Sequence, residues 1–117
     1  MLFRSQFFEK SLDIAEQLVQ QEPGRADYLR QLSVSYNNLG DLQSALGNGE
    51  AARQFFEKSL DIRERLVQEE PGRADYLRDL IISLVKLGSA PHLQRAVNIV
   101  LDLQRTSRLN KADVDGR

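Results

Sequence analysis

Two long segments of this chain occur twice, and their repetition constrains the fold more than any other feature of the sequence. The stretch FFEKSLDI begins at Phe7 and again at Phe55, which is 48 residues later, and PGRADYLR recurs with the same offset. Between residues 6–32 and 54–80 only four positions differ: Ala15/Arg63, Gln17/Arg65, Gln21/Glu69 and Gln31/Asp79. A fixed period of this length predicts a tandem array of stacked units rather than one globular core.

The repeated units are predicted to be helical. Apolar residues recur within them at spacings of three and four, which is the period of a helix with one packed face. EPG segments at Glu22 and Glu70 and a GNG segment at Gly47 interrupt this pattern, because proline removes a backbone donor and glycine permits a sharp reversal. The sequence therefore predicts an all-α protein of five antiparallel helices without strands. These helices cover Arg4–Gln21, Arg25–Leu46, Glu50–Glu69, Arg73–Leu87 and a segment that follows Pro91.

The composition argues against several kinds of partner and site. A net charge of −1 gives no reason to expect binding to nucleic acid or to an anionic membrane. The chain has no cysteine, so it offers neither a disulfide framework nor a thiolate ligand for a metal. No apolar run is long enough for a signal peptide or a membrane span. We therefore expect a cytoplasmic protein.

The sequence shows no pattern typical of a catalytic or metal-binding site. The single histidine, His92, follows a proline at a predicted helix start, where a capping or solvent-exposed role is expected. No second histidine or cysteine could complete a metal site with it. Ser33, Ser35 and Ser59 lie in predicted helices without a histidine in the pattern to act as their base. We therefore predict that the protein is not an enzyme and has no catalytic, cofactor-binding or metal-binding residues.

One part of the sequence resembles a known repeat family. YNNLG, which runs from Tyr36 to Gly40, is followed by Ala52, by Phe56 four residues later, and by Pro71. This resembles the signature W-x2-L-G-x2-Y…A-x3-F…P of the tetratricopeptide repeat. The resemblance implies that Gly40 and Ala52 let the two helices of one repeat approach closely. The period of 48, against about 34 for the ordinary repeat, implies longer helices, as in the long-helix bacterial members of the family.

The resemblance also implies how the chain is divided. We expect an α-solenoid of antiparallel helix pairs, with about two and a half repeats in a domain that covers residues 1–109. Residues 3–22 are expected to form a second helix without its first helix, residues 24–70 a full repeat, and residues 72–109 a shorter final repeat. Residues 110–117 lack apolar periodicity and are expected to form a flexible tail.

A binding face follows from the same resemblance. In tetratricopeptide proteins the first helices of successive repeats line a concave face that holds peptides, so we expect a scaffold that binds a protein or peptide partner. Asn37, Asn38 and Lys86 fall where some chaperone-binding members hold a terminal carboxylate. Val85 and Ser89 depart from that pattern, and a polar wall without a clamp is the alternative. The residues expected on the face are Arg30, Val34, Asn37, Asn38, Asp41, Ser44, Arg78, Ile82 and Lys86.

Two other functions are open at this point. The first predicted helix carries apolar residues at Phe7, Ile14 and Leu18, the flank that a preceding helix would cover in a longer array. This flank either belongs to a fragment of such an array or serves as a self-association surface that forms a homodimer. A third hypothesis is that the chain is a regulatory segment of a larger signalling protein.

Overall fold

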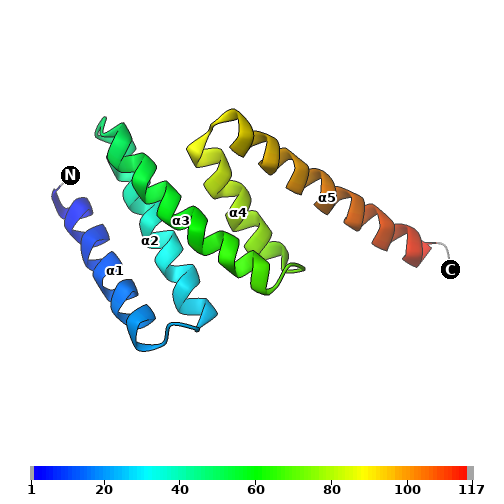
Figure 1. Cartoon of the computed structure of the whole chain (residues 1–117), viewed down its shortest axis with the longest axis horizontal. Helices are drawn as coiled ribbons and strands as arrows, with labels where there is room; N and C mark the ends of the chain where they lie inside the picture. The colour runs from blue at the N-terminus through cyan, green and yellow to red at the C-terminus, as the bar shows by residue number, and fades with distance from the viewer. Residues whose placement is uncertain (1, 116–117) are drawn as a thin grey trace.

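The chain folds into helices alone over the part that the structure describes. The computed structural model describes the backbone of residues 2–115 and the side chains of residues 3–107, and it contains no strand in this range. Consecutive helices run in opposite directions and lie side by side (Figure 1). The all-α prediction is therefore confirmed. The helices are α1 (Leu2–Gln21), α2 (Ala26–Ala45), α3 (Gly49–Glu69), α4 (Ala74–Leu87) and α5 (Ala90–Asp115).

The sequence repeat is also a structural repeat, as the turns before α2 and α4 show. The guanidinium of Arg25 donates to Glu22 at 2.9 Å and to Asp27 at 2.8 Å, and it lies 4.1 Å from the centre of the Tyr28 ring. Arg73 makes the same set of contacts before α4. Both arginines therefore fix the chain reversal in the same way, since their side chains tie the turn to the first turn of the next helix.

The core follows the contacts between neighbouring helices along the array. One cluster joins Leu29 of α2 with Leu66 of α3 and Tyr76 of α4. Another joins α3, α4 and α5 through side chains that include Leu84 and Ala96. The core is therefore distributed along the stack, as expected for a repeat protein. The buried apolar residues are Ala15, Leu29, Leu32, Leu39, Leu42, Ala52, Phe56, Leu60, Leu66, Tyr76, Leu80, Leu84 and Ala96.

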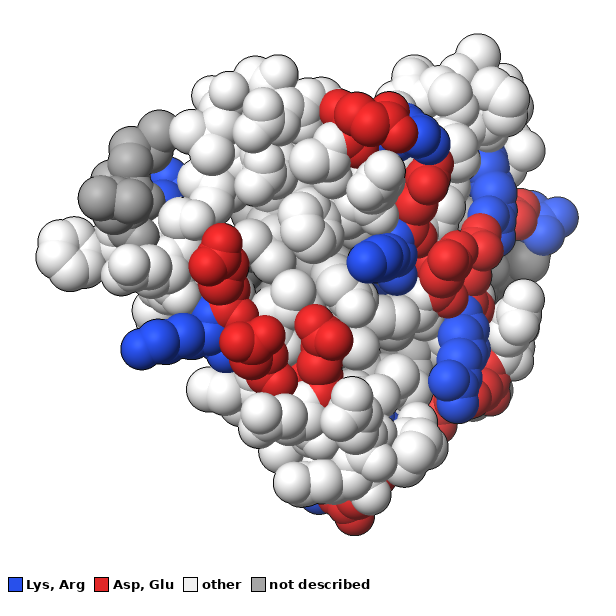
Figure 2. All heavy atoms as spheres, turned by 60° about the vertical axis from the view of Figure 1, so that its left-hand side comes forward, with Lys and Arg blue, Asp and Glu red and all other residues white. Residues whose placement is uncertain are grey.

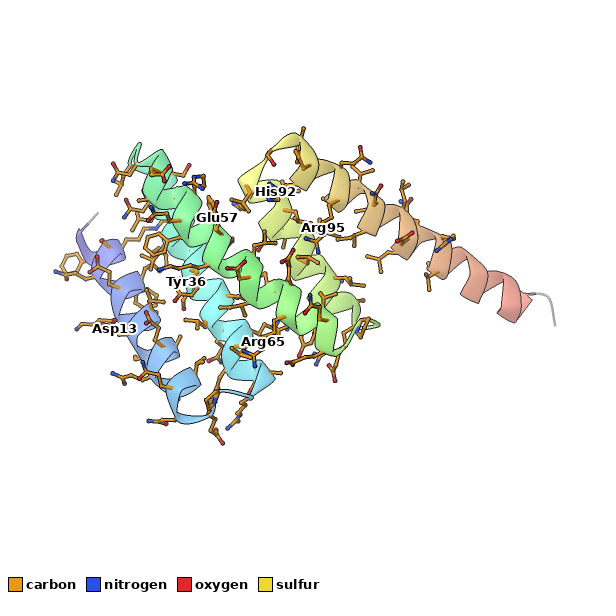
Figure 3. The ribbon with its side chains drawn as sticks, in the orientation of Figure 1. Asp13, Tyr36, Glu57, Arg65, His92 and Arg95 are labelled. Atoms are coloured by element: carbon orange, nitrogen blue, oxygen red, sulfur yellow. The ribbon has the colours of Figure 1, made fainter. Side chains whose placement is uncertain are left out.

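Helices α2 and α3 pack closely at Gly40, where the sequence predicts that they cross. A Cβ atom on Gly40 would lie 2.5 to 2.9 Å from ring carbons of Phe56, which is itself 6% exposed. Nearby, Tyr36 stacks on Phe55 with their ring centroids 6.3 Å apart, and burial raises the pKa of Tyr36 (Figure 3). Glycine at position 40 is therefore required by the packing of Phe56.

The second glycine of the repeated LG pair does not lie at a helix crossing. Gly88 ends α4 with φ at 70°, a left-handed conformation that glycine adopts without strain. A Cβ atom there would meet only the Val85 carbonyl oxygen, at 3.5 Å. The pair α4 and α5 therefore differs from the pair α2 and α3, because α4 has 14 residues whereas α2 has 20.

The last helix is longer than predicted and is loosely packed. The prediction ended at residue 109, but α5 continues to Asp115 and extends away from the other helices (Figure 1). Residues 116–117 of the expected tail lie outside the described residues, and the flexibility of the tail stays a prediction. Ala96 is the one buried side chain of α5 among those described, and Val100, four residues after Ala96 as Phe56 is after Ala52, is 38% exposed.

Candidate functional site

Two ion pairs connect α2 with α4 on the face that the sequence predicts as the binding face. Arg30 donates from Nε to Asp79 at 2.7 Å and approaches Asp75 at 3.4 Å. The hydrogen bond to Asp79 raises the pKa of Arg30. Lys86 donates to Asp41 at 2.8 Å. Arg30 and Asp79 are 49 positions apart in the chain and Asp41 and Lys86 are 45 apart, so these pairs bridge two helices that α3 holds next to each other.

Exposed apolar side chains lie on the same face. Val34 is 44% exposed, Ile82 is 39% exposed and Val85 is 52% exposed. Val34 follows Arg30 by one helical turn on α2, and Ile82 precedes Lys86 by one turn on α4, so the ion pairs flank the apolar residues. We call Val34, Ile82 and Val85, with the two ion pairs, the α2–α4 surface.

The remaining predicted residues of the face have different surroundings. Asn37 is half-buried, and its Oδ1 atom is buried without a hydrogen-bond partner among the described residues. Asn38 is half-buried and lines a groove towards α1. Ser44 and Arg78 are exposed. The predicted residues thus lie on two helices, α2 and α4. The ammonium of Lys86 is already paired with the Asp41 carboxylate.

A buried arginine joins three helices, and the sequence reasoning missed it. Arg63 of α3 is 4% exposed and donates from Nε to the Ser33 hydroxyl at 3.1 Å. Its Nη1 donates to the Ser83 hydroxyl at 2.9 Å and to the Asp79 carbonyl oxygen at 3.1 Å. Burial lowers the pKa of Arg63. The Ser59 hydroxyl donates to the Ser33 carbonyl oxygen at 2.9 Å, which completes a polar contact between α2, α3 and α4.

A signal for this cluster was present in the comparison of the two copies. Arg63 stands at the position of Ala15, which lies on the predicted buried stripe of the first helix. Asp79 stands at the position of Gln31, so a cation and an anion enter the second copy together. A charged residue among apolar positions needs buried hydrogen-bond partners, so Arg63 could have been singled out from the sequence, although its partners could not.

A groove of about 630 Å³ lies between α1 and α2. Of the residues predicted for self-association, Ile14 and Leu18 line this groove. Ile14 is 58% exposed and Phe7 is 65% exposed. Viewed from the α1 side, charged side chains gather in separate groups with uncharged surface between them (Figure 2). The groove is also lined by Ser11, Ala15, Asp27, Arg30, Gln31, Val34, Ser35 and Asn38.

The single histidine takes part in the cap of the last helix. The His92 imidazole contacts the Ser89 hydroxyl, and the backbone N–H of His92 donates to the same hydroxyl at 3.4 Å. Further along α5, Arg95 forms an ion pair with Glu64 of α3 (Figure 3). Within the described range, no three histidine or acidic side chains are arranged to hold a metal ion. None of the helices described is both long enough and apolar enough to span a membrane.

The stacked antiparallel helix pairs define this chain as a helical-repeat protein. Residues 32–71 match the family model of the tetratricopeptide repeat, so the chain carries a repeat of that family. The matched segment begins in α2 and ends at Pro71, after α3, and it includes the crossing of Gly40 with Phe56. Comparisons with curated proteins and with solved structures gave no match.

Proposed function

We propose that this protein is an interaction scaffold that holds a segment of a partner protein against the α2–α4 surface. The observation that carries the proposal is the exposure of Val34, Ile82 and Val85 on two helices that ion pairs also connect. Burial of apolar surface contributes roughly 25 cal/mol per Å² to association. Arg30 and Lys86 already have carboxylate partners within the protein. A ligand that covers the apolar residues therefore does not leave these cations buried without a partner.

The charges favour one kind of ligand over another. A carboxylate clamp of the kind that Asn37, Asn38 and Lys86 suggest is not favoured, because Asp41 at 2.8 Å competes for the Lys86 ammonium. Arg78 is exposed and forms no ion pair with another described residue. We therefore propose a largely apolar segment with an acidic group that lies near Arg78. The family supports a scaffold role, and we further propose a cytoplasmic location, since the chain has no cysteine.

We expect Ile82→Glu/Val85→Glu to lower the amount of partner captured from a lysate of the source cell by about tenfold, because buried carboxylates without a cation oppose association. The amount of each captured protein is measured by quantitative mass spectrometry. Val97→Glu/Leu101→Glu on α5 is the matched control, since these residues are 50% and 52% exposed. Equal capture by the two variants would remove the α2–α4 surface as the binding site.

Self-association is a second candidate function, and a specific observation favours it. Phe7 and Ile14 of α1 are exposed, whereas their counterparts in α3, Phe55 and Ile62, are half-buried by neighbouring helices. The exposed surface of α1 has the same residues as the packed surface of α3, so its burial by another helix is favourable. We propose a homodimer or a larger assembly through Phe7, Ile14, Leu18 and the adjoining groove. A regulatory role within a larger signalling protein is compatible with either function.

A further inference from the structure

The groove between α1 and α2 has a counterpart within the same molecule that is filled. Residues 48 positions later line the corresponding groove between α3 and α4, and α2 lies in it. Arg30 of α2 binds Asp75 and Asp79 there. As a result Leu66 is 1% exposed, whereas its counterpart Leu18 is only half-buried. The filled groove is therefore a template for what the open groove can accept, namely an α-helix laid as α2 is laid.

The open groove differs from the filled one at four lining positions, and three of these change a charge; at the fourth, Val34 replaces Ile82. Gln31 replaces Asp79, Ala15 replaces Arg63, and Asn38 replaces Lys86. Asp27, the counterpart of Asp75, remains acidic. The helix that fits this groove should therefore carry a cation opposite Asp27, a larger apolar side chain opposite Ala15, and no acid opposite Asn38.

Helix α4 carries this pattern. At the positions of Arg30 and Ser33 in α2, it has Arg78 and Ile81. One contact of the filled groove is therefore kept and another is exchanged. The pair Arg30–Asp75 becomes Arg78 opposite Asp27. In the filled groove the small side chain of Ser33 contacts the large side chain of Arg63. In the open groove the large side chain of Ile81 would contact the small side chain of Ala15, so the large and small partners are exchanged between the two helices. Helix α4 ends at Leu87, before the position that Asp41 has in α2, so it brings no acid opposite Asn38.

We infer that the α1–α2 groove of one copy of this chain receives α4 of a second copy, so that copies stack head to tail. In this arrangement α1 and α2 of one copy pack on α4 of the other as α3 and α4 pack on α2 within the chain. The inference rests on self-association, the second function proposed above, and names its geometry. It also covers part of Phe7 and Ile14, which are 65% and 58% exposed in the single chain and whose counterparts Phe55 and Ile62 are half-buried.

The loose packing of α5 permits this arrangement. Helix α5 lies on the side of α4 that α1 of the second copy would cover, and Ala96 is its one buried side chain among those described. Leu93, Val97, Val100 and Leu101 of α5 are 38 to 52% exposed. In contrast, α1 has Phe8 where α3 has Phe56, the buried residue that packs on Gly40 of the preceding helix. Displacement of α5 by α1 of the next copy therefore replaces a loosely packed helix with one that matches α3.

The test reverses the charges of the one ion pair that the inference creates. We expect light scattering to show that the molar mass of the wild-type chain rises with concentration. Asp27→Arg alone and Arg78→Asp alone should each raise the dissociation constant at least about tenfold, because each places like charges opposite one another. An equimolar mixture of the two variants should restore assembly, and so should both substitutions in one chain. Asp61→Arg and Arg105→Asp, at exposed positions of α3 and α5, are the matched controls, and circular dichroism checks that every variant is folded.

The other outcomes separate this inference from self-association in general. Single variants that assemble as well as the wild type would overturn the head-to-tail geometry and leave another form of self-association, such as pairing of two α1 helices. Failure of the mixture to restore assembly would also overturn the contact between Arg78 and Asp27. A wild-type chain that stays monomeric at several hundred micromolar would overturn both proposals and assign the groove to a helix from another source.

Discussion

Gly40→Leu should lower the free energy of unfolding by about 3 kcal/mol, the upper end of the usual range for overpacked cores. A Cβ atom at position 40 would already lie 2.5 Å from the Phe56 ring. Phe56 is 6% exposed and packs between α2 and α3, so a shift of its ring would disturb the contact between these helices. Leucine therefore forces the two helices apart. Urea unfolding followed by circular dichroism measures the change.

A second glycine of the same chain provides the control. A Cβ atom on Gly72 would meet no other atom within 4 Å, and the residue does not have a positive φ. Gly72→Leu should therefore change the free energy of unfolding by less than about 0.5 kcal/mol, as is usual for surface positions. If both leucine variants unfold at the same urea concentration, the claim that α2 and α3 pack too closely at Gly40 for a larger side chain is wrong.

Arg63→Ala should lower the free energy of unfolding by about 2 to 3 kcal/mol. The side chain makes three hydrogen bonds to groups on α2 and α4, and hydrogen bonds to charged groups contribute about 1.5 to 3 kcal/mol each before the cost of burying the cation is subtracted. Its removal also leaves a cavity at the contact of three helices, with the hydroxyls of Ser33 and Ser83 losing a donor. Thermal and urea unfolding both measure this loss.

The same residue type two positions along α3 gives a matched control. Arg65 has a side chain that is 53% exposed and pairs with Glu69 at 3.4 Å, one helical turn away. Arg65→Ala should change the free energy of unfolding by less than about 0.5 kcal/mol, since exposed pairs of this kind contribute little. A loss of equal size for Arg63→Ala and Arg65→Ala would show that the buried polar contact does not stabilise the stack.

Local sequence patterns are sufficient to predict the helical repeat. Apolar spacing and the positions of EPG and GNG are local properties, and they predict the helices to within a few residues for α1 to α4. The crossing at Gly40 could also be predicted, because a glycine inside a helix, followed by a phenylalanine in the next, is explained by close packing. These features depend on neighbours in the chain or in the adjacent helix, which is why they can be read from the order of residues.

The contacts between residues of α2 and residues of α4 could not be predicted from the sequence. Arg30 and Asp79 are 49 residues apart, and Asp41 and Lys86 are 45 apart, so their pairing depends on how α3 sets the two helices against each other. The sequence placed Arg30 and Lys86 on a binding face, whereas the structure shows both paired within the protein. The structure also shows that α5 packs less closely than α3. Helix α4 is capped early, at Gly88, and Val100 of α5 is exposed whereas Phe56, at the corresponding position of α3, is buried. Helix periodicity defines a face, but the depth at which a neighbouring helix packs on it is set by the fit of side chains across the contact.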